Sequence, residues 1–235
     1  EATRDDEYPL LLHYPYYLLY SSQVVKQADL VFALYVCGDC FSLEQKRRDF
    51  AYYEAITVRD SSLSASIQGI VAAEVGHLDL TYEYFRETAL VDLLDRAGNT
   101  ADGLHLASLA GAWLVAVAGF GGMRDYGETL SFAPRLPAAL SRLRFRLNYR
   151  GRKLGVDIQP GRARYELISG EPLEVLHFGT PITLAVGEPQ IHECPPAPEP
   201  PPVEPPPGRA PGKMGVGIET SAKELAEERI RRQQR

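Results

Sequence analysis

The sequence predicts an α+β protein with a helical first half, a small antiparallel β-sheet or sandwich domain, and a proline-rich end. Helical spacing of apolar residues recurs up to about residue 125, whereas strict alternation begins near residue 143. Beyond residue 188 proline dominates and large apolar residues become rare. We therefore expect domain limits of 1–125, 126–188 and 189–235, with the last segment mostly disordered.

The composition narrows the class of protein. The 235 residues carry a formal net charge of −6, which disfavours non-specific nucleic-acid binding because that needs a basic surface. Three cysteines are an odd and sparse set for a disulfide framework, which favours the reducing cytoplasm. No apolar run approaches the roughly 20 residues of a membrane span. We expect a cytoplasmic protein with no nucleic-acid or membrane partner.

The first elements follow from proline positions and periodicity. Residues 9–22 are apolar and aromatic, but Pro9 and Pro15 interrupt any long helix, so a loop and a short helix are expected. Residues 23–37 carry apolar side chains at nearly 3.6-residue spacing, which predicts a helix ending at Gly38.

Further helices are predicted up to residue 118. Ser42 and Gln45 form a capping-box pattern that opens a helix. Small apolar side chains over residues 63–76 predict a buried helix, and an amphipathic helix follows over residues 78–92. Residues 105–118 are apolar nearly all round, which indicates a helix in the middle of something large.

These helices suggest a helical barrel or a bundle of helical hairpins, and they are too few to close a large barrel. The chain also begins with Glu1 rather than Met. Both observations fit a piece of a longer protein, although N-terminal processing would also remove the initial Met.

The second half predicts strands separated by short turns. Their spacing of roughly ten residues is typical of a small antiparallel sheet or sandwich. The predicted strands cover residues 143–149, 153–158, 164–168, 173–178 and 182–186. Residues 219–235 are expected to be disordered or a marginal helix.

The densest polar stretch lies between residues 54 and 64, directly before the buried helix. Hydroxyls and backbone N–H groups at a helix start, aided by a cation, form an anion site. The alternative is that Asp60 or Ser61 only caps the helix. The residues that could assemble around this site are Lys26, Gln27, Glu54, Arg59, Ser61, Ser62, Ser64, His105 and Ser108.

Other chemistries find little support in the sequence. There is no P-loop, dinucleotide glycine fingerprint or nucleophile elbow. Cys37 and Cys40 form a single C-x-x-C pair without a partner pair or nearby histidine, which is weak support for a metal site. We expect no metal.

The order of several segments resembles glycoside hydrolase family 65, which contains inverting phosphorylases of maltose, trehalose and kojibiose. The likeness covers residues 8 to about 125, and the later strands resemble the family's small C-terminal β domain. The segments that carry it are Val25-Lys26-Gln27-Ala28-Asp29, Tyr53-Glu54, Thr57-Val58-Arg59-Asp60-Ser61-Ser62-Leu63-Ser64, Ala73-Glu74-Val75-Gly76, Asn99-Thr100, Asp102-Gly103-Leu104-His105, Ala107-Ser108, Ala110-Gly111, Trp113 and Gly119-Phe120-Gly121-Gly122-Met123-Arg124.

The resemblance implies a fold and a reaction. Residues 1–125 would be the last helices of an (α/α)6 barrel, followed by the C-terminal β domain. Phosphate would attack the anomeric carbon of an α-glucosyl disaccharide while a carboxylic acid protonates the leaving oxygen, giving β-glucose 1-phosphate and glucose. The implied partners are a disaccharide and inorganic phosphate as co-substrate, without a cofactor, and a homodimer of the full-length protein.

The resemblance also assigns roles to residues. Lys26 and Gln27 match positions that hold the transferred glucosyl unit, and Glu54 matches one that reaches the acceptor sugar. The phosphate pocket corresponds to Ser61, Ser62 and His105. The general acid is expected upstream of this chain, so no catalytic residue is assigned within it. Arg59 stands where many relatives carry histidine.

Two other functions stay open at this stage. One is a family 65 hydrolase, similar to a trehalase, that uses water in place of phosphate. The other, from a different class, is a non-catalytic binding or assembly module built from the same helices and strands.

Overall fold

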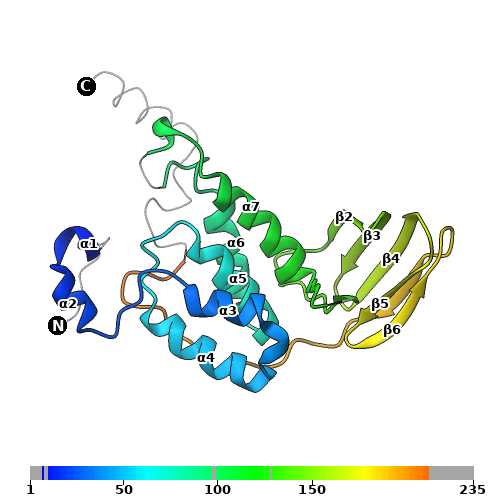
Figure 1. Ribbon diagram of the computed structural model, residues 1–235, viewed down its shortest axis with the longest axis horizontal. Helices are drawn as coiled ribbons and strands as arrows, with labels where there is room; N and C mark the ends of the chain where they lie inside the picture. Colours follow the sequence, from blue (N-terminus) through cyan, green and yellow to red (C-terminus); the bar gives the residue numbers. More distant parts are fainter. Residues whose placement is uncertain (1–6, 8–9, 97–98, 128, 212–235) are drawn as a thin grey trace.

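The computed structural model describes residues 7, 10–96, 99–127 and 129–211 and shows a helical part joined to a β part (Figure 1). The mixed helical and largely antiparallel architecture predicted from the sequence is confirmed. The helices are α1 (Leu10–His13), α2 (Tyr16–Tyr20), α3 (Asp29–Val36), α4 (Leu43–Ile56), α5 (Ser64–Val75), α6 (Leu78–Ala89) and α7 (Leu106–Leu114), with short turns η2 (Gly38–Cys40), η3 (Thr100–Asp102) and the π-type turn η4 (Val115–Phe120).

Helix α5 is the centre of the helical part. Its small side chains let neighbouring helices approach on several sides, and most of its residues are buried. Val71 and Val75 pack in one apolar cluster with α3 and α4, whereas Ile70 packs in another with η4. Glycines mark two close approaches: a Cβ at Gly69 would lie 3.2 Å from Tyr84 of α6, and a Cβ at Gly111 of α7 would lie 2.6 Å from Ser66 of α5. The predicted buried helix over residues 63–76 is thus confirmed.

The ends of two helices agree with the sequence signals. Ser42 and Gln45 make both bonds of the capping box at the start of α4. Gly76 ends α5 in a left-handed conformation, with φ of 111°, which glycine adopts without steric cost.

The predicted helix over residues 23–37 is wrong over residues 23–28. Helix α3 begins only at Asp29, and residues 23–28 form a loop. The backbone of Val25 pairs instead with Ile56 and Val58, at N···O distances of 2.9 Å each. A long-range pairing has therefore replaced the local helical hydrogen bonds that the periodicity favoured.

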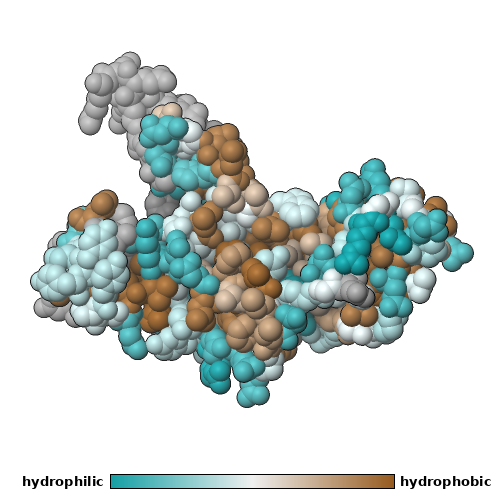
Figure 2. Space-filling view, viewed as in Figure 1, coloured by the Kyte–Doolittle hydropathy of each residue, from teal (hydrophilic) through white to brown (hydrophobic). Residues whose placement is uncertain are grey.

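Helix α7 does not lie in the middle of the described part of the chain. One side packs on α5 and α6, but Leu106, Leu109 and Trp113 expose 72%, 36% and 51% of their surface. Figure 2 shows hydrophobic surface gathered over the middle of the helical part. The apolar pattern thus predicted the helix correctly. Burial on all sides was also expected, but α7 is buried on one side only in the described part of the chain.

The β part contains two small sheets. The sheet orders are β1–β5–β6 and β2–β3–β4–β7. All five predicted strands are present, and β1 and β7 were missed because each is very short. Strand β1 also pairs parallel to β5, an exception to the predicted antiparallel arrangement. The strands are β1 (Leu130–Phe132), β2 (Leu143–Tyr149), β3 (Arg152–Gln159), β4 (Arg162–Ser169), β5 (Leu173–His177), β6 (Thr180–Leu184) and β7 (Gln190–Glu193).

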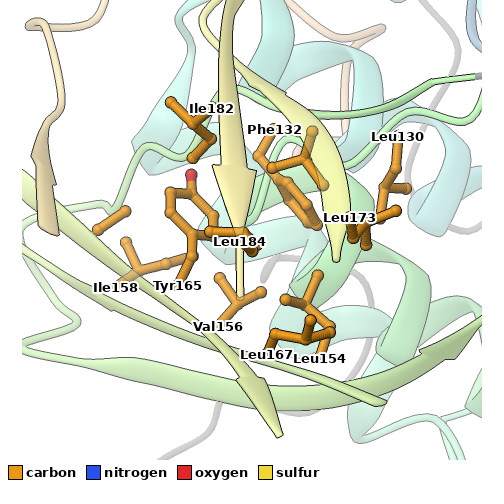
Figure 3. Close-up of a cluster of buried hydrophobic side chains, with 12 residues drawn as sticks. Leu130, Phe132, Leu154, Val156, Ile158, Tyr165, Leu167, Leu173, Ile182 and Leu184 are labelled. Atoms are coloured by element: carbon orange, nitrogen blue, oxygen red, sulfur yellow. The ribbon is translucent and has the colours of Figure 1, made fainter. Parts of the chain in front are cut away.

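Alternating residues of the two sheets meet in one apolar core (Figure 3). In β3, Leu154, Val156 and Ile158 are all buried, as the period of two requires. Tyr165 of β4 is fully buried beside Phe132 of β1, with ring centroids 5.4 Å apart. These contacts join the sheets into a small sandwich.

The chain beyond residue 188 departs from the expected disordered tail within the described region. Strand β7 extends the sheet to Glu193, and residues 194–211 then run back along the helical part as the orange segment of Figure 1. We call residues 194–209 the strap. Val203 packs against the α3–α4–α5 cluster, and Pro206 is buried. The predicted marginal helix over residues 219–235 lies outside the described residues.

Within the described ranges, no helix combines the length and the apolar character that crossing a bilayer requires.

Candidate functional site

The candidate site is centred on the loop of residues 57–63, which connects α4 to α5. Its backbone pairs with the loop before α3: the Asp60 N–H donates to the Lys26 carbonyl at 3.0 Å. The Ala28 N–H donates to the Ser64 hydroxyl at 3.3 Å. These bonds bring Lys26 and Gln27 beside the polar loop, although they lie more than thirty positions earlier in the chain.

The start of α7 lies on the other side of the same loop. The Ser108 hydroxyl donates to the Ser62 carbonyl at 3.3 Å. His105 is the residue before α7, one turn from Ser108, so it lies at the same helix end. The structure therefore brings the three predicted phosphate residues, Ser61, Ser62 and His105, into one neighbourhood.

Asp92 holds His105 in place. One Asp92 oxygen accepts the His105 backbone N–H at 2.9 Å, and the other lies 2.6 Å from Nδ1 of the ring. The Asp92 side chain is 6% exposed and the His105 side chain 20% exposed. A carboxylate beside Nδ1 favours the tautomer with the proton on that nitrogen, in which Nε2 is a hydrogen-bond acceptor.

The start of α5 is not simply a capped helix end. Its N-cap residue is Leu63, and no side chain accepts a capping bond there. Asp60 instead accepts the Leu10 N–H at 2.9 Å and faces Arg209 at 3.3 Å. The Ser61 hydroxyl accepts the Leu63 N–H at 3.4 Å, and the Ser61 carbonyl accepts the Ser64 N–H at 3.1 Å. The Asp60 side chain is thus engaged elsewhere, whereas Ser61 keeps one long bond of the capping kind, so the capping alternative stays open for Ser61.

Lys26 and Ser62 are exposed, whereas Gln27 is partly buried and donates to Asp29 at 2.9 Å. The exposed ammonium and hydroxyl leave polar groups free to meet a ligand in water. The N-terminal end of α5 also favours negative charge. These features fit an anion or a sugar hydroxyl better than an apolar ligand.

Glu54 is not on the surface of this site. It is fully buried, and its carboxylate accepts bonds from Gln68 at 2.8 Å and from the Tyr84 hydroxyl. Burial raises the pKa of Glu54, while the Tyr84 hydroxyl and the Arg59 charge oppose that rise. Burial likewise raises the pKa of Tyr84 well above its usual value, so its hydroxyl stays protonated as a donor.

Arg59 connects this buried network to the loop. Its guanidinium donates to the Tyr84 hydroxyl at 3.0 Å and lies 3.7 Å from Glu87. Its backbone has φ of 53°, the left-handed region that non-glycine residues seldom adopt. Such a conformation persists only where the surroundings hold it. Here the side chain is 1% exposed and fixed between Tyr84 and Glu87.

Arg209, at the end of the strap, contacts the loop from the opposite direction. Its guanidinium donates to the carbonyls of Val58 and Arg59, the latter at 2.8 Å. Arg59 in turn donates to the Arg209 carbonyl. Burial raises the pKa of Asp60, whereas the Arg209 charge and the Leu10 N–H oppose that rise.

The sequence indicated the loop but not the residues that support it. Asp92, Tyr84 and Gln68 lie in helices or turns whose patterns show only amphipathicity. Arg209 stands among prolines and carries no local signal. Cys37 and Cys40, next to η2, are exposed free thiols.

Comparisons with known proteins identify the family of this chain. Residues 1–114 match the central catalytic domain of glycosyl hydrolase family 65, and residues 123–184 match the C-terminal domain of that family. Together these matches cover most of the chain. The chain therefore belongs to glycosyl hydrolase family 65.

Individual relatives support the same assignment. An uncharacterized glycosyl hydrolase of Mycobacterium tuberculosis (strain ATCC 25618 / H37Rv) is 50% identical over 206 residues, which is 82% of this chain and 26% of the relative. The α,α-trehalose phosphorylase of Thermoanaerobacter brockii is 42% identical over 184 residues, 78% of this chain and 24% of the relative. The maltose phosphorylase of Bacillus subtilis (strain 168) is 40% identical over 178 residues, 76% and 24% respectively.

A solved structure of a related protein resembles this chain. The chain superposes on a protein from the human microbiome assigned as a kojibiose phosphorylase, with a TM-score of 0.76 and 26% identity. The match covers 81% of this chain and 28% of that one. The chain spans about a quarter of the length of the curated relatives it matches.

Proposed function

We propose that this chain supplies part of the phosphate and sugar site of an inverting α-glucoside phosphorylase. The observation that carries the proposal is the junction of three segments at one loop: Lys26 and Gln27 on one side, Ser61 and Ser62 within it, and His105 on the other. The relatives named as phosphorylases of trehalose, maltose and kojibiose indicate the reaction class.

In the proposed reaction, a phosphate oxygen forms a bond to the anomeric carbon as the bond from that carbon to the leaving oxygen breaks. A carboxylic acid gives its proton to the leaving oxygen, so the products are β-glucose 1-phosphate and glucose. Phosphate replaces the water of an inverting hydrolase. This chain's contribution is to bind and orient, because the general acid is proposed to lie outside it.

Each residue has a proposed part in that binding. The Ser61 and Ser62 hydroxyls donate to phosphate oxygens, next to the favourable field at the start of α5. Nε2 of His105 accepts a hydrogen bond from the protonated oxygen of hydrogen phosphate, because the ring proton on Nδ1 is held by Asp92. Lys26 and Gln27 bind the transferred glucosyl unit. Glu54 is proposed to act on the acceptor side of the site. Its buried carboxylate would do so by positioning Gln68 and Tyr84, which donate to it.

Ser62→Ala in a full-length form of the protein tests the phosphate site. Its carbonyl bond to Ser108 is kept in the variant, so we expect folding to be preserved. Loss of one hydrogen bond to a charged ligand corresponds to about a tenfold or greater rise in the phosphate KM. Ser169→Ala, an exposed serine at the end of β4, is the matched control. An unchanged phosphate KM would contradict the assigned cradle.

The chain by itself tests where the general acid lies. We expect purified residues 1–235 to release no β-glucose 1-phosphate from trehalose, maltose or kojibiose in phosphate buffer. Release of that product would show that the acid lies within these residues. Assaying a full-length form with and without phosphate separates phosphorolysis from hydrolysis, since a hydrolase would form free glucose without phosphate.

A further inference from the structure

The strap joins two parts of the molecule that the sequence separates widely. It leaves the sheet after β7, where the Cys194 N–H donates to the Gly161 carbonyl at 2.8 Å. It then crosses the C-terminal end of α5 at Gly76, where the Pro198 carbonyl occupies the space that a Cβ would need. A turn follows, in which the Arg209 N–H donates to the Pro206 carbonyl at 2.9 Å. The strap is thus seated at its start, middle and end.

Its final residue makes an unusual set of bonds for a proline-rich segment. The Arg209 guanidinium reaches two successive carbonyls, those of Val58 and Arg59, and the Asp60 carboxylate at 3.3 Å. Arg209 is only 7% exposed. A buried guanidinium is stable only when its donors are satisfied and its charge is balanced. The loop meets both needs, because it offers carbonyl oxygens and Asp60.

The Arg209 hydrogen bonds reach the part of the loop whose backbone conformation is unfavourable. Arg59 has φ of 53°, and its carbonyl is one of the two that accept from Arg209. A strained residue keeps its conformation only when surrounding contacts fix it. The Arg59 side chain fixes it from the α6 side, and Arg209 fixes its backbone from the strap side. Ser61 and Ser62 follow directly, so their positions depend on this clamp.

We propose that Arg209 is a positioning residue of the candidate site. It holds loop 57–63 in the conformation that presents Ser61 and Ser62. Only the expected effect of Arg209 on substrate binding rests on the proposed function. The clamp itself does not depend on what the site binds. A lysine could offer one ammonium to the carbonyls but could not reproduce the planar fork of the guanidinium.

Hydrogen exchange in the 235-residue chain tests the clamp. The amides of Val58 and Asp60 report on the loop, because they donate to the carbonyls of Val25 and Lys26. We expect Arg209→Ala to speed their exchange about tenfold or more, as expected for lost bonds to a charged donor. Arg209→Lys should give an intermediate rate. Amides of the β3–β4 ladder should be unaffected, and unchanged loop exchange would overturn the proposal.

Glu204→Ala is the matched control, because Glu204 is an exposed residue of the same strap. It should leave the exchange of the Val58 and Asp60 amides at the wild-type rate. If it speeds loop exchange as much as Arg209→Ala does, the strap as a whole rather than the Arg209 side chain holds the loop, and the proposal fails.

Kinetics of a full-length form distinguish positioning from simple stability. Arg209→Ala should raise the phosphate KM about tenfold with kcat within about twofold, and Arg209→Lys should recover part of the loss. If exchange rises but KM stays constant, Arg209 is only structural and the proposal fails. A lower KM would mean that the strap obstructs the site, which also overturns it. If the wild type performs no phosphorolysis, the proposed function fails, while hydrogen exchange still decides whether Arg209 holds the loop.

Discussion

The buried polar network of the helical part and the apolar core of the β part are stabilised in different ways. The network joins Glu54, Arg59, Tyr84 and Arg209, which come from α4, a loop, α6 and the strap. The β core joins many apolar side chains from both sheets, such as Leu154 and Leu167 on the adjacent strands β3 and β4. The network therefore depends on a few directional hydrogen bonds and ion pairs, whereas the β core depends on many non-directional apolar contacts. Removing one network member should leave a buried charge, whereas trimming a core residue leaves only a cavity.

The largest expected effect is on the network. Arg59→Met should lower the free energy of unfolding of the helical part by about 3–5 kcal/mol, because it leaves the buried Glu54 and the partly buried Glu87 without their cation. Denaturant unfolding followed by far-ultraviolet circular dichroism measures this. Arg48→Met is the control: that side chain is 72% exposed, so a change within about 0.5 kcal/mol is expected. Equal losses in both variants would remove the contrast between network and surface.

The second effect is on the β core. Leu154→Ala should cost about 2–5 kcal/mol through lost burial and the cavity left behind. Val186→Ala, at a position 56% exposed, should have little effect. When combined with Arg59→Met, the Leu154→Ala cost should add within about 0.5 kcal/mol, since the two residues share no partner. Strong non-additivity would show that the two regions do not act independently.

The third test uses the pH dependence of stability, which arises from titratable groups and not from apolar side chains. Arg124 and Lys46, at 2.8 and 2.5 Å, outweigh burial and hold the pKa of Glu74 below its ordinary value of 4.5. Its stabilising contribution is therefore present above about pH 4.5 and is lost as pH falls through the lower folded pKa. Glu74→Gln should be less stable than wild type at pH 7, and the difference should shrink in acid.

Unfolding measured from pH 7 to pH 3 checks this sign. Glu166→Gln, which alters an ion pair on β4 with 37% exposure at Glu166, should change the pH profile little. Leu154→Ala should shift stability equally at every pH. A Glu74→Gln deficit that grew as pH fell would contradict the lowered pKa.

The smallest effect concerns a local feature. Ser42→Ala removes the side-chain acceptor of the Gln45 N–H at 3.2 Å and should cost about 1 kcal/mol. Exposed Ser141→Ala is the control and should change stability by less than about 0.5 kcal/mol. Unfolding midpoints of the two variants compare them directly. A cost as large as that of Arg59→Met would mean that α4 depends on its cap as heavily as on the buried network.

The same contrast explains what the sequence could predict. Strand alternation from Leu143 onward and the Ser42 capping box depend on neighbours in the chain, so both were predicted correctly. The loop at residues 23–28 was not, because its hydrogen bonds go to residues 56–60. Resemblance to the family indicated Ser61, Ser62 and His105 together. Neither pattern nor resemblance indicated Asp92, Tyr84 or Arg209, whose roles arise only from long-range contacts.

The contact between the strap and the helical part closes a long loop of the chain through hydrogen bonds rather than a covalent bond. Arg59 and Arg209 are 150 positions apart, and the whole β part lies between them. The entropic cost of closing such a loop grows only slowly with its length, so a few good bonds at the junction suffice. The β part is therefore attached to the helices at both of its ends. Moving the β part away from the helices would therefore first break the strap contacts at Gly76 and Val203, before it could disturb Arg209 and loop 57–63.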